Sequence, residues 1–209
     1  MATDTSASAK QPYDEKPRDK TVSFLDPVEK PTRLALRILY WYARRQWGTV
    51  PRPFSVFCAR MPLVFGNFFG KVSRLDRKLV LPGETAMLIR GRVAATNMCN
   101  WCVDAQRWYA LNKAPQSLAK LDALDQYRTN PLFDYKERAA LDFATELTNH
   151  KRVSRGTFAE LSRHYSEREV CDIVWLVSSE HLYNLNNLGL NIGSDGLCEV
   201  SDLPRVPAA

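Results

Sequence analysis

The chain has 209 residues, of which 45% are hydrophobic and 25% are charged, with 9 glycines and 12 prolines. This composition excludes collagen-like, low-complexity and wholly disordered chains. The length is sufficient for one domain with a sizeable hydrophobic core. Five cysteines without a secretory leader argue against an extracellular fold held together by disulfides.

The net charge of +6 is concentrated in one segment, because residues 31–92 contain 12 basic and 2 acidic residues. Such a segment can indicate an anionic partner, either nucleic acid or a membrane surface. In a helix over residues 31–47, however, Arg33, Arg37 and Arg44 would share one stripe while the other faces are apolar. No nucleic-acid-binding motif accompanies the stripe. We therefore expect a solvated basic stripe, no nucleic-acid partner, and a homo-oligomer that buries the apolar faces.

The two ends of the chain are expected to lie outside the folded domain. Residues 1–30 are polar and are expected to form a disordered tail, residues 31–200 a helical domain, and residues 201–209 a second tail. We expect no signal peptide and no membrane span, because no apolar segment is long enough, and hence a cytoplasmic location.

From residue 33 onward the apolar residues recur at helical spacing, and no segment alternates as a strand would. The predicted fold class is therefore all-α, a compact multi-helix domain. Helices are expected over about 31–47, 62–73, 82–95, 99–113, 116–122, 138–148, 156–165 and 170–191. Capping residues are expected at Asp134 with Glu137, at Ser154, and at Ser166 with Glu169, and Gly193 is expected to stop the last and longest helix.

The central motif is Cys99-Asn100-Trp101-Cys102. Two cysteines three residues apart face the same way on a helix, with Cβ atoms about 5–6 Å apart, and a small adjustment permits a disulfide. A helix N-terminus also favours the thiolate form of cysteine. A structural zinc site needs two more ligands, and the remaining cysteines and the three histidines are scattered, so no metal is expected. Two small buried side chains remain the alternative to a redox pair.

The sequence resembles the alkylhydroperoxidase D-like, carboxymuconolactone decarboxylase superfamily over residues 55–198, most specifically in LPGETAMLIRGRVAATNMCNWCVDAQ. The resemblance implies an all-helical fold in which Cys102 is the peroxidatic cysteine and Cys99 the resolving cysteine. It also implies a small hydroperoxide or other small organic substrate, an external dithiol reductant and no metal, haem, flavin or other cofactor. Members of the family associate as dimers, trimers or hexamers, so the resemblance implies one of these sizes for the homo-oligomer.

Two family positions carry different residues here. The family's histidine falls on Gln106 and its activating glutamate on Met87, so the proton relay of the family is absent as written. Glutamine can hydrogen-bond a thiolate but does not exchange a proton near neutral pH. Candidate replacements are Glu84, one turn before Met87, and Glu180 with His181 in the last helix. For Glu84 the favoured role is to stabilise the helix dipole.

Other residues near the motif are assigned structural roles. Asp104 is expected to point away from Cys102 into solvent. Trp101, Trp108 and Tyr109 are expected to line a cavity or belong to the core. Cys58 and Cys171 are expected to be buried and inert, and Cys198 to be exposed.

Three functions remain open. The favoured hypothesis is a thiol-dependent peroxidase or disulfide oxidoreductase with catalytic Cys102 and Cys99. The alternatives are a non-redox decarboxylase or lactone-processing enzyme of the same superfamily, and a binding protein whose cysteines sense oxidation.

Overall fold

A computed structural model describes residues 23–198, apart from the side chains of residues 64–66. Within this range the regular structure is entirely helical, which confirms the all-α prediction. The first 22 residues of the expected N-terminal tail and the whole C-terminal tail lie outside the described residues. The helices are α1 (Leu34–Trp47), α2 (Pro62–Asp76), α3 (Gly83–Thr96), α4 (Asn100–Lys113), α5 (Leu118–Asp122), α6 (Tyr135–His150), α7 (Arg155–His164) and α8 (Glu167–Gly189).

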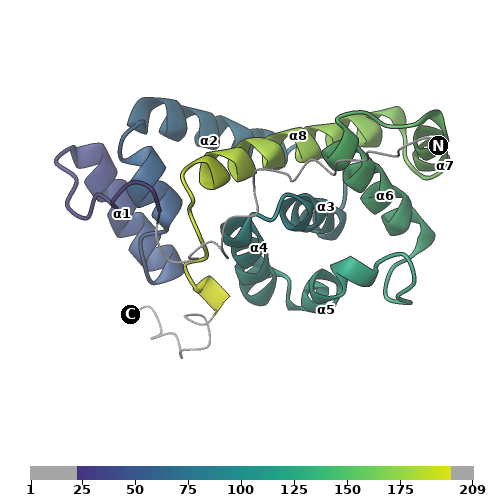
Figure 1. Ribbon diagram of the computed structural model, residues 1–209, viewed down its shortest axis with the longest axis horizontal. Helices are drawn as coiled ribbons and strands as arrows, with labels where there is room; N and C mark the ends of the chain where they lie inside the picture. The colour runs from purple at the N-terminus through teal and green to yellow at the C-terminus, as the bar shows by residue number, and fades with distance from the viewer. Residues whose placement is uncertain (1–22, 199–209) are drawn as a thin grey trace, which may run out of the picture.

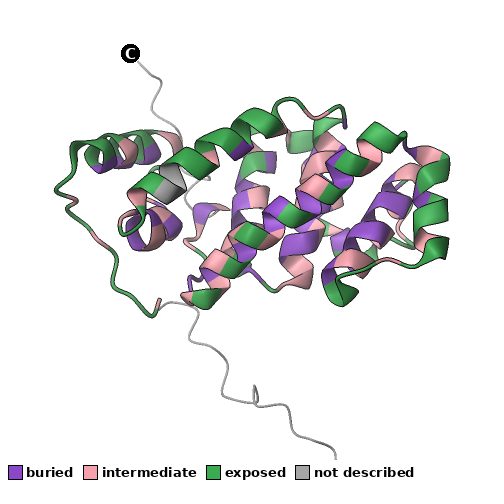
Figure 2. Ribbon diagram, turned by 90° about the horizontal axis from the view of Figure 1, so that it is seen from above, coloured by how far each residue is buried: buried purple, intermediate pink, exposed green. Residues whose placement is uncertain are grey.

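Helix α3 is central and packs against α4, α6 and α8. Figure 1 shows α8 running along one side, with α1 and α2 at one end of the molecule and α6 and α7 at the other. The main core joins α3, α6 and α8 through residues such as Ile89, Phe143 and Ile173. At Gly91 a Cβ would lie 2.8 Å from a methyl carbon of Leu121, so α3 approaches α5 closely where this glycine stands. Buried residues gather on the inward faces of the helices (Figure 2).

The predicted helix starts are confirmed. The Glu137 amide donates to Asp134 Oδ1 at 2.7 Å, and the Asp134 amide donates back to Glu137 Oε2 at 3.1 Å. Ser166 and Glu169 form the same reciprocal box at α8, and Ser154 caps α7. These side chains satisfy backbone N–H groups that a helix start leaves without partners.

The end of α8 differs from the prediction. The helix ends at Gly189, four residues before Gly193. Asn191 adopts the left-handed conformation (φ 52°), and the Ile192 amide donates to the Asn187 carbonyl at 2.8 Å. This is a Schellman motif with asparagine, which tolerates positive φ, in the position where glycine is commonest. The predicted stop at Gly193 is therefore too late, because asparagine takes the place of glycine in this cap.

Two segments before α2 were not predicted to be ordered structure. Pro53–Cys58 forms a short π-helical segment (η1) that buries Cys58, as expected for that cysteine. Burial raises the pKa of the Cys58 thiol. Part of the expected tail, residues 23–30, lies on the domain, where the Val28 amide donates to the Ser55 carbonyl at 2.9 Å.

The predicted exposure of three residues, Cys171, Cys198 and Asp104, is corrected by the structure. Cys171 is exposed, because the buried face of α8 follows Ile173, Leu176 and Val177 and leaves Cys171 outside it. Cys198 is half-buried and contacts the backbone carbonyl of Asp104. Asp104 itself is buried, because it accepts hydrogen bonds from the segment that follows α8.

Helix α1 packs on the domain with one face only. Leu36, Tyr40 and Ala43 are buried, whereas Ile38 and Trp41 are 58% and 62% exposed in the single chain. The predicted homo-oligomer, which would cover this face, stays a prediction. None of the helices described between residues 23 and 198 has the length and apolarity to cross a bilayer.

Candidate active site

The two cysteines of the motif stand where α3 turns into α4. Met98 adopts the left-handed conformation (φ 56°), and the Cys99 amide donates back to the Ala94 carbonyl at 2.9 Å. This cap ends α3 and makes Cys99 the N-cap of α4, with Cys102 in its first turn. The cysteines are joined as a disulfide with Cα atoms 5.3 Å apart, and both are buried. The pair thus has the spacing for reversible disulfide formation.

Asn187 of α8 contacts both sulfur atoms. Its Nδ2 lies 3.3 Å from Cys102 Sγ and 3.8 Å from Cys99 Sγ, and its side chain is buried. In the reduced protein the same amide is placed to donate to a Cys102 thiolate, which would favour the charged form. Sequence reasoning did not single out Asn187. The available signal was the run of polar residues in LYNLNNLG, within a helix that otherwise buries apolar side chains.

Cys102 lines a cavity of about 670 Å³, whereas Cys99 is not among the lining residues. The walls come from α1, η1, α2, α3, α4 and α8, and they are rich in aromatic rings. The aromatic lining residues are Tyr42, Trp47, Phe54, Phe57, Phe69, Trp101, Tyr109 and Tyr183. Trp101 and Tyr109 therefore line the cavity, as one of the two expectations had it, and Trp108 lies in the core beside Trp47. A small apolar or aromatic molecule fits these walls, and Cys102 is the sulfur it would meet.

The structure separates the proposed relay residues into two groups. Gln106 and Met87 line the cavity with Cys102. Glu84 is not among the lining residues, and its carboxylate accepts from Ser117 Oγ at 2.9 Å and from Lys120 Nζ at 3.4 Å. In the first turn of α3 it also suits the helix dipole.

His181 is likewise outside the cavity lining. Its Nδ1 lies 3.2 Å from Asn97 Nδ2, and its buried Nε2 has no hydrogen-bond partner among the described residues. Burial lowers the pKa of this imidazole, and the nearby Lys151 acts in the same direction. The neighbouring Glu180 is the residue of the pair that lines the cavity.

Glu180 belongs to a charged cluster in the cavity wall. Arg90 donates to Glu180 Oε2 at 3.0 Å and to Asp76 Oδ2 at 2.8 Å. The guanidinium also lies over the Tyr183 ring, 5.8 Å from its centroid. Burial raises the pKa of the Glu180 carboxyl, and the ion pair with Arg90 opposes that shift. Sequence reasoning missed Arg90 and Asp76, since charged residues on a helix are usually solvated.

The segment after α8 covers the start of α4. Asp104 accepts from Ser194 Oγ and from the Leu197 amide, each at 2.8 Å. Trp101 Nε1 donates to Asp195 Oδ2 at 2.7 Å, and Arg52 pairs with Asp195 at 3.2 Å. These contacts hold the C-terminal part of the described chain against the helix that carries the cysteines.

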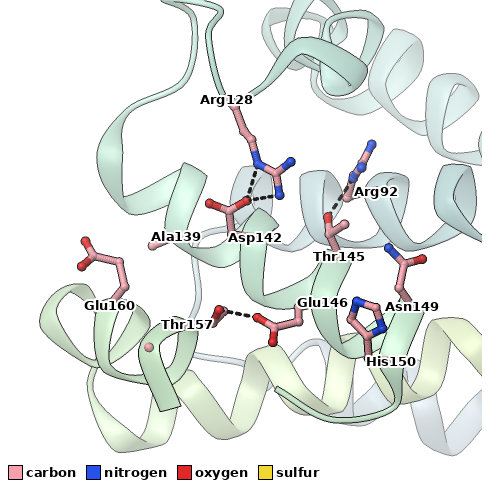
Figure 3. A pocket seen from close by; sticks show the side chains of 11 residues that line it. Arg92, Arg128, Ala139, Asp142, Thr145, Glu146, Asn149, His150, Thr157 and Glu160 are labelled. Carbon is pink, nitrogen blue, oxygen red and sulfur yellow. Dashed lines mark hydrogen bonds and ion pairs between the residues drawn. The ribbon is translucent and has the colours of Figure 1, made fainter. Parts of the chain in front are cut away.

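A second hollow, of about 650 Å³, lies beside α6 and α7 and shares no lining residue with the first (Figure 3). Its walls are polar and internally paired, because Arg128 donates to Asp142 at 2.8 Å and Thr157 bonds to Glu146. Within the described part of the chain no group of three His, Cys, Asp or Glu side chains is placed to hold a metal ion.

Comparison with known proteins identifies the fold. No protein-family model matches the sequence. An uncharacterized protein of Escherichia coli (strain K12), YnjA, is 28% identical over 180 residues, which cover 85% of this chain and 97% of that protein. Among solved structures, an uncharacterized peroxidase-related protein from Silicibacter sp. TM1040 matches with a TM-score of 0.71 and 19% identity, over 87% of this chain and 95% of the other.

An alkylhydroperoxidase D core protein from Ralstonia eutropha JMP134, also described as peroxidase-related, matches with a TM-score of 0.66 and 22% identity, over 88% of this chain and 98% of the other. The chain has the alkylhydroperoxidase D-like fold. The same fold occurs in the debrominase Bmp8, whose cysteine-to-alanine variant in complex with 2,3,4-tribromopyrrole matches with a TM-score of 0.70 and 18% identity, over 88% of this chain and 98% of the other.

Proposed function

We propose that this alkylhydroperoxidase D-like chain is a thiol-dependent oxidoreductase that reduces small hydroperoxides through Cys102 and Cys99. The observation that carries the proposal is the cysteine pair at disulfide spacing with one member, Cys102, in the wall of an aromatic cavity. The N-terminus of α4 and the Asn187 amide both favour a thiolate at Cys102.

The proposed reaction has three steps. The Cys102 thiolate attacks one peroxide oxygen, the O–O bond breaks, and the released alkoxide takes a proton from water to leave as alcohol. The Cys102 sulfenic acid then condenses with the Cys99 thiol, which forms the disulfide and releases water. An external dithiol restores both thiols by exchange. Gln106, which lines the cavity with Cys102, offers a hydrogen-bonding amide and no titrating proton.

Peroxide consumption by the reduced protein, followed by stopped flow with thiol titration before and after, tests the proposal. We expect two thiols to be lost per chain and one peroxide to be consumed. Cys102→Ser should abolish the reaction, and Cys99→Ser should leave a sulfenic acid that a dimedone probe traps. Cys171→Ser, which removes an exposed thiol outside the site, is the matched control. An unchanged thiol titre after peroxide treatment would refute the proposal.

Reductive dehalogenation is a second candidate, favoured by the fold match to a debrominase and by the aromatic walls of the cavity. Two thiols and one aryl bromide would give the disulfide, bromide and the arene, with the proton on carbon supplied by water. Bromide release from a brominated pyrrole, compared with peroxide consumption by the same reduced protein, separates the two activities. Activity on a carboxylated substrate in the Cys99→Ser/Cys102→Ser double variant would instead support the non-redox alternative.

A further inference from the structure

The cavity has two chemically different ends. Cys102 and Asn187 meet at one end. Along α4, Tyr109 follows Cys102 by seven residues on the same face, which is about 10 Å at the rise of an α-helix. Along α8, Glu180 precedes Asn187 by seven residues on the same face, again about 10 Å. The Tyr109 hydroxyl interacts electrostatically with Arg90 and Tyr183, so both helices give about the same separation between the sulfur end and the end that contains Glu180.

The far end is a cluster of charges with spare acceptor capacity. Two carboxylates, Asp76 and Glu180, share the single guanidinium of Arg90. Arg90 also donates to Ser179, and its face lies against Tyr183, so much of its donor capacity is already used. Asp76 accepts hydrogen bonds from Arg90 and Trp175, and Glu180 accepts from Arg90 and Asn184, whereas a carboxylate has about four acceptor sites.

The other ionisable groups in the cavity lining do not offset the excess of carboxyl groups over guanidinium groups in this cluster. Burial raises the pKa of the Tyr109 and Tyr183 hydroxyls, so both stay neutral at physiological pH. Lys113 is exposed and lies one further turn along α4 from Tyr109, where water solvates its ammonium. The cluster sets one guanidinium against two carboxyl groups, the buried Glu180 and the half-buried Asp76, so it favours a hydrogen-bond donor or a cation.

From this arrangement we propose that the cavity selects an elongated aromatic substrate that carries an amine, or another donor group, about 10 Å from its reducible group. The ring lies between the aromatic walls, the donor group binds Glu180 and Asp76, and the reducible group reaches Cys102. The proposal rests on the proposed function for the identity of the reducible end. What it adds is the substrate class. A substrate with a carboxylate at the donor position is disfavoured, because that group would face the carboxyl groups of Glu180 and Asp76.

Binding without turnover tests the substrate class separately from the chemistry. The protein carries Cys102→Ser, and the probes share ten carbons and differ at one end: 4-phenylbutylamine, 4-phenyl-1-butanol and 4-phenylbutyrate. Titration calorimetry should show the amine binding most tightly, with an affinity about tenfold or more above that of the carboxylate. If the carboxylate binds as tightly as the amine, or if none of the three binds, the proposal is wrong.

Variants locate the preference in the cluster. Glu180→Gln, in the Cys102→Ser background, should remove most of the preference for amine over carboxylate, and Glu167→Gln on the exposed start of the same helix should retain it. If circular dichroism shows that Glu180→Gln does not fold, Asp76→Asn at a half-buried position tests the same preference. An undiminished preference in both cluster variants would overturn the assignment. Amine selectivity without peroxide turnover would refute the proposed function and leave the substrate class standing.

Discussion

The Asn187 side-chain amide lies 3.3 Å from Cys102 Sγ, across the interface between α8 and α4. In the reduced protein a donor at this distance would stabilise a thiolate over a thiol. Asn187→Leu should raise the pKa of the reduced Cys102 thiol and slow its alkylation by iodoacetamide about tenfold at neutral pH. The rate measured as a function of pH gives the shift directly. Leu185→Ala, exposed on the same helix, serves as the control, and an equal rate profile in both variants would show that the contact has no electrostatic effect.

Gln106→His should restore a proton carrier beside Cys102. Histidine titrates near neutral pH, so proton transfer to the leaving alkoxide would no longer depend on water alone. We expect peroxide turnover to rise roughly tenfold to a hundredfold, with a new pH dependence near the usual pKa of histidine. Gln106→Asn keeps the amide and should not produce that pH dependence. A histidine variant with wild-type rate at every pH would exclude proton transfer as the limiting step.

His181 should affect the pH dependence of stability more than turnover. Because its pKa is lowered in the folded protein, the unfolded chain takes up the proton more readily. The stability that the neutral imidazole contributes is therefore complete above the unfolded pKa, about 6.5, and is lost as the pH falls below it. Urea unfolding between pH 8 and pH 5.5 should be less pH-dependent in His181→Gln than in the exposed control His150→Gln. Loss of most peroxide turnover in His181→Gln would instead assign the residue to catalysis.

Asp104→Ala should destabilise the protein, because the Leu197 and Cys198 amides both donate to this carboxylate. Leaving two such donors without an acceptor costs about 2–4 kcal/mol in the free energy of unfolding. Hydrogen exchange should also accelerate in residues 194–198 before the rest of the domain. Asp125→Ala, whose carboxylate is almost fully exposed, is expected to change stability little. Unchanged exchange in residues 194–198 would contradict this anchoring role.

Trp41→Glu or Ile38→Glu should convert the predicted homo-oligomer to single chains of 23.8 kDa. Both side chains are exposed on α1, and a charge there would be costly to bury between copies. Light scattering measures the mass, and Arg37→Glu, on the basic stripe interpreted as solvated, should leave the oligomer intact. A wild-type protein that already scatters as 23.8 kDa would refute the prediction.

The local features of this protein follow from residues that are close along the chain. Capping residues such as Ser166 and Asp134 act on amides three residues away, and the cysteine spacing fixes which helix face both sulfurs share, so these features depend on neighbours along the chain. The spacing of apolar residues did not predict the exposure of Cys171 correctly, because that exposure depends on which side of α8 meets the core.

The surroundings of Cys102 depend on how the helices pack. Asn187, Arg90, Asp76 and Glu180 stand on three helices, and only Glu180 among them was a candidate from the sequence. Helix packing around α3 brings them together and removes water from Glu180, which is 2% exposed. The same packing holds Glu84 and His181 to other partners outside the cavity, because a side chain's reach is limited to the neighbours its helix face presents.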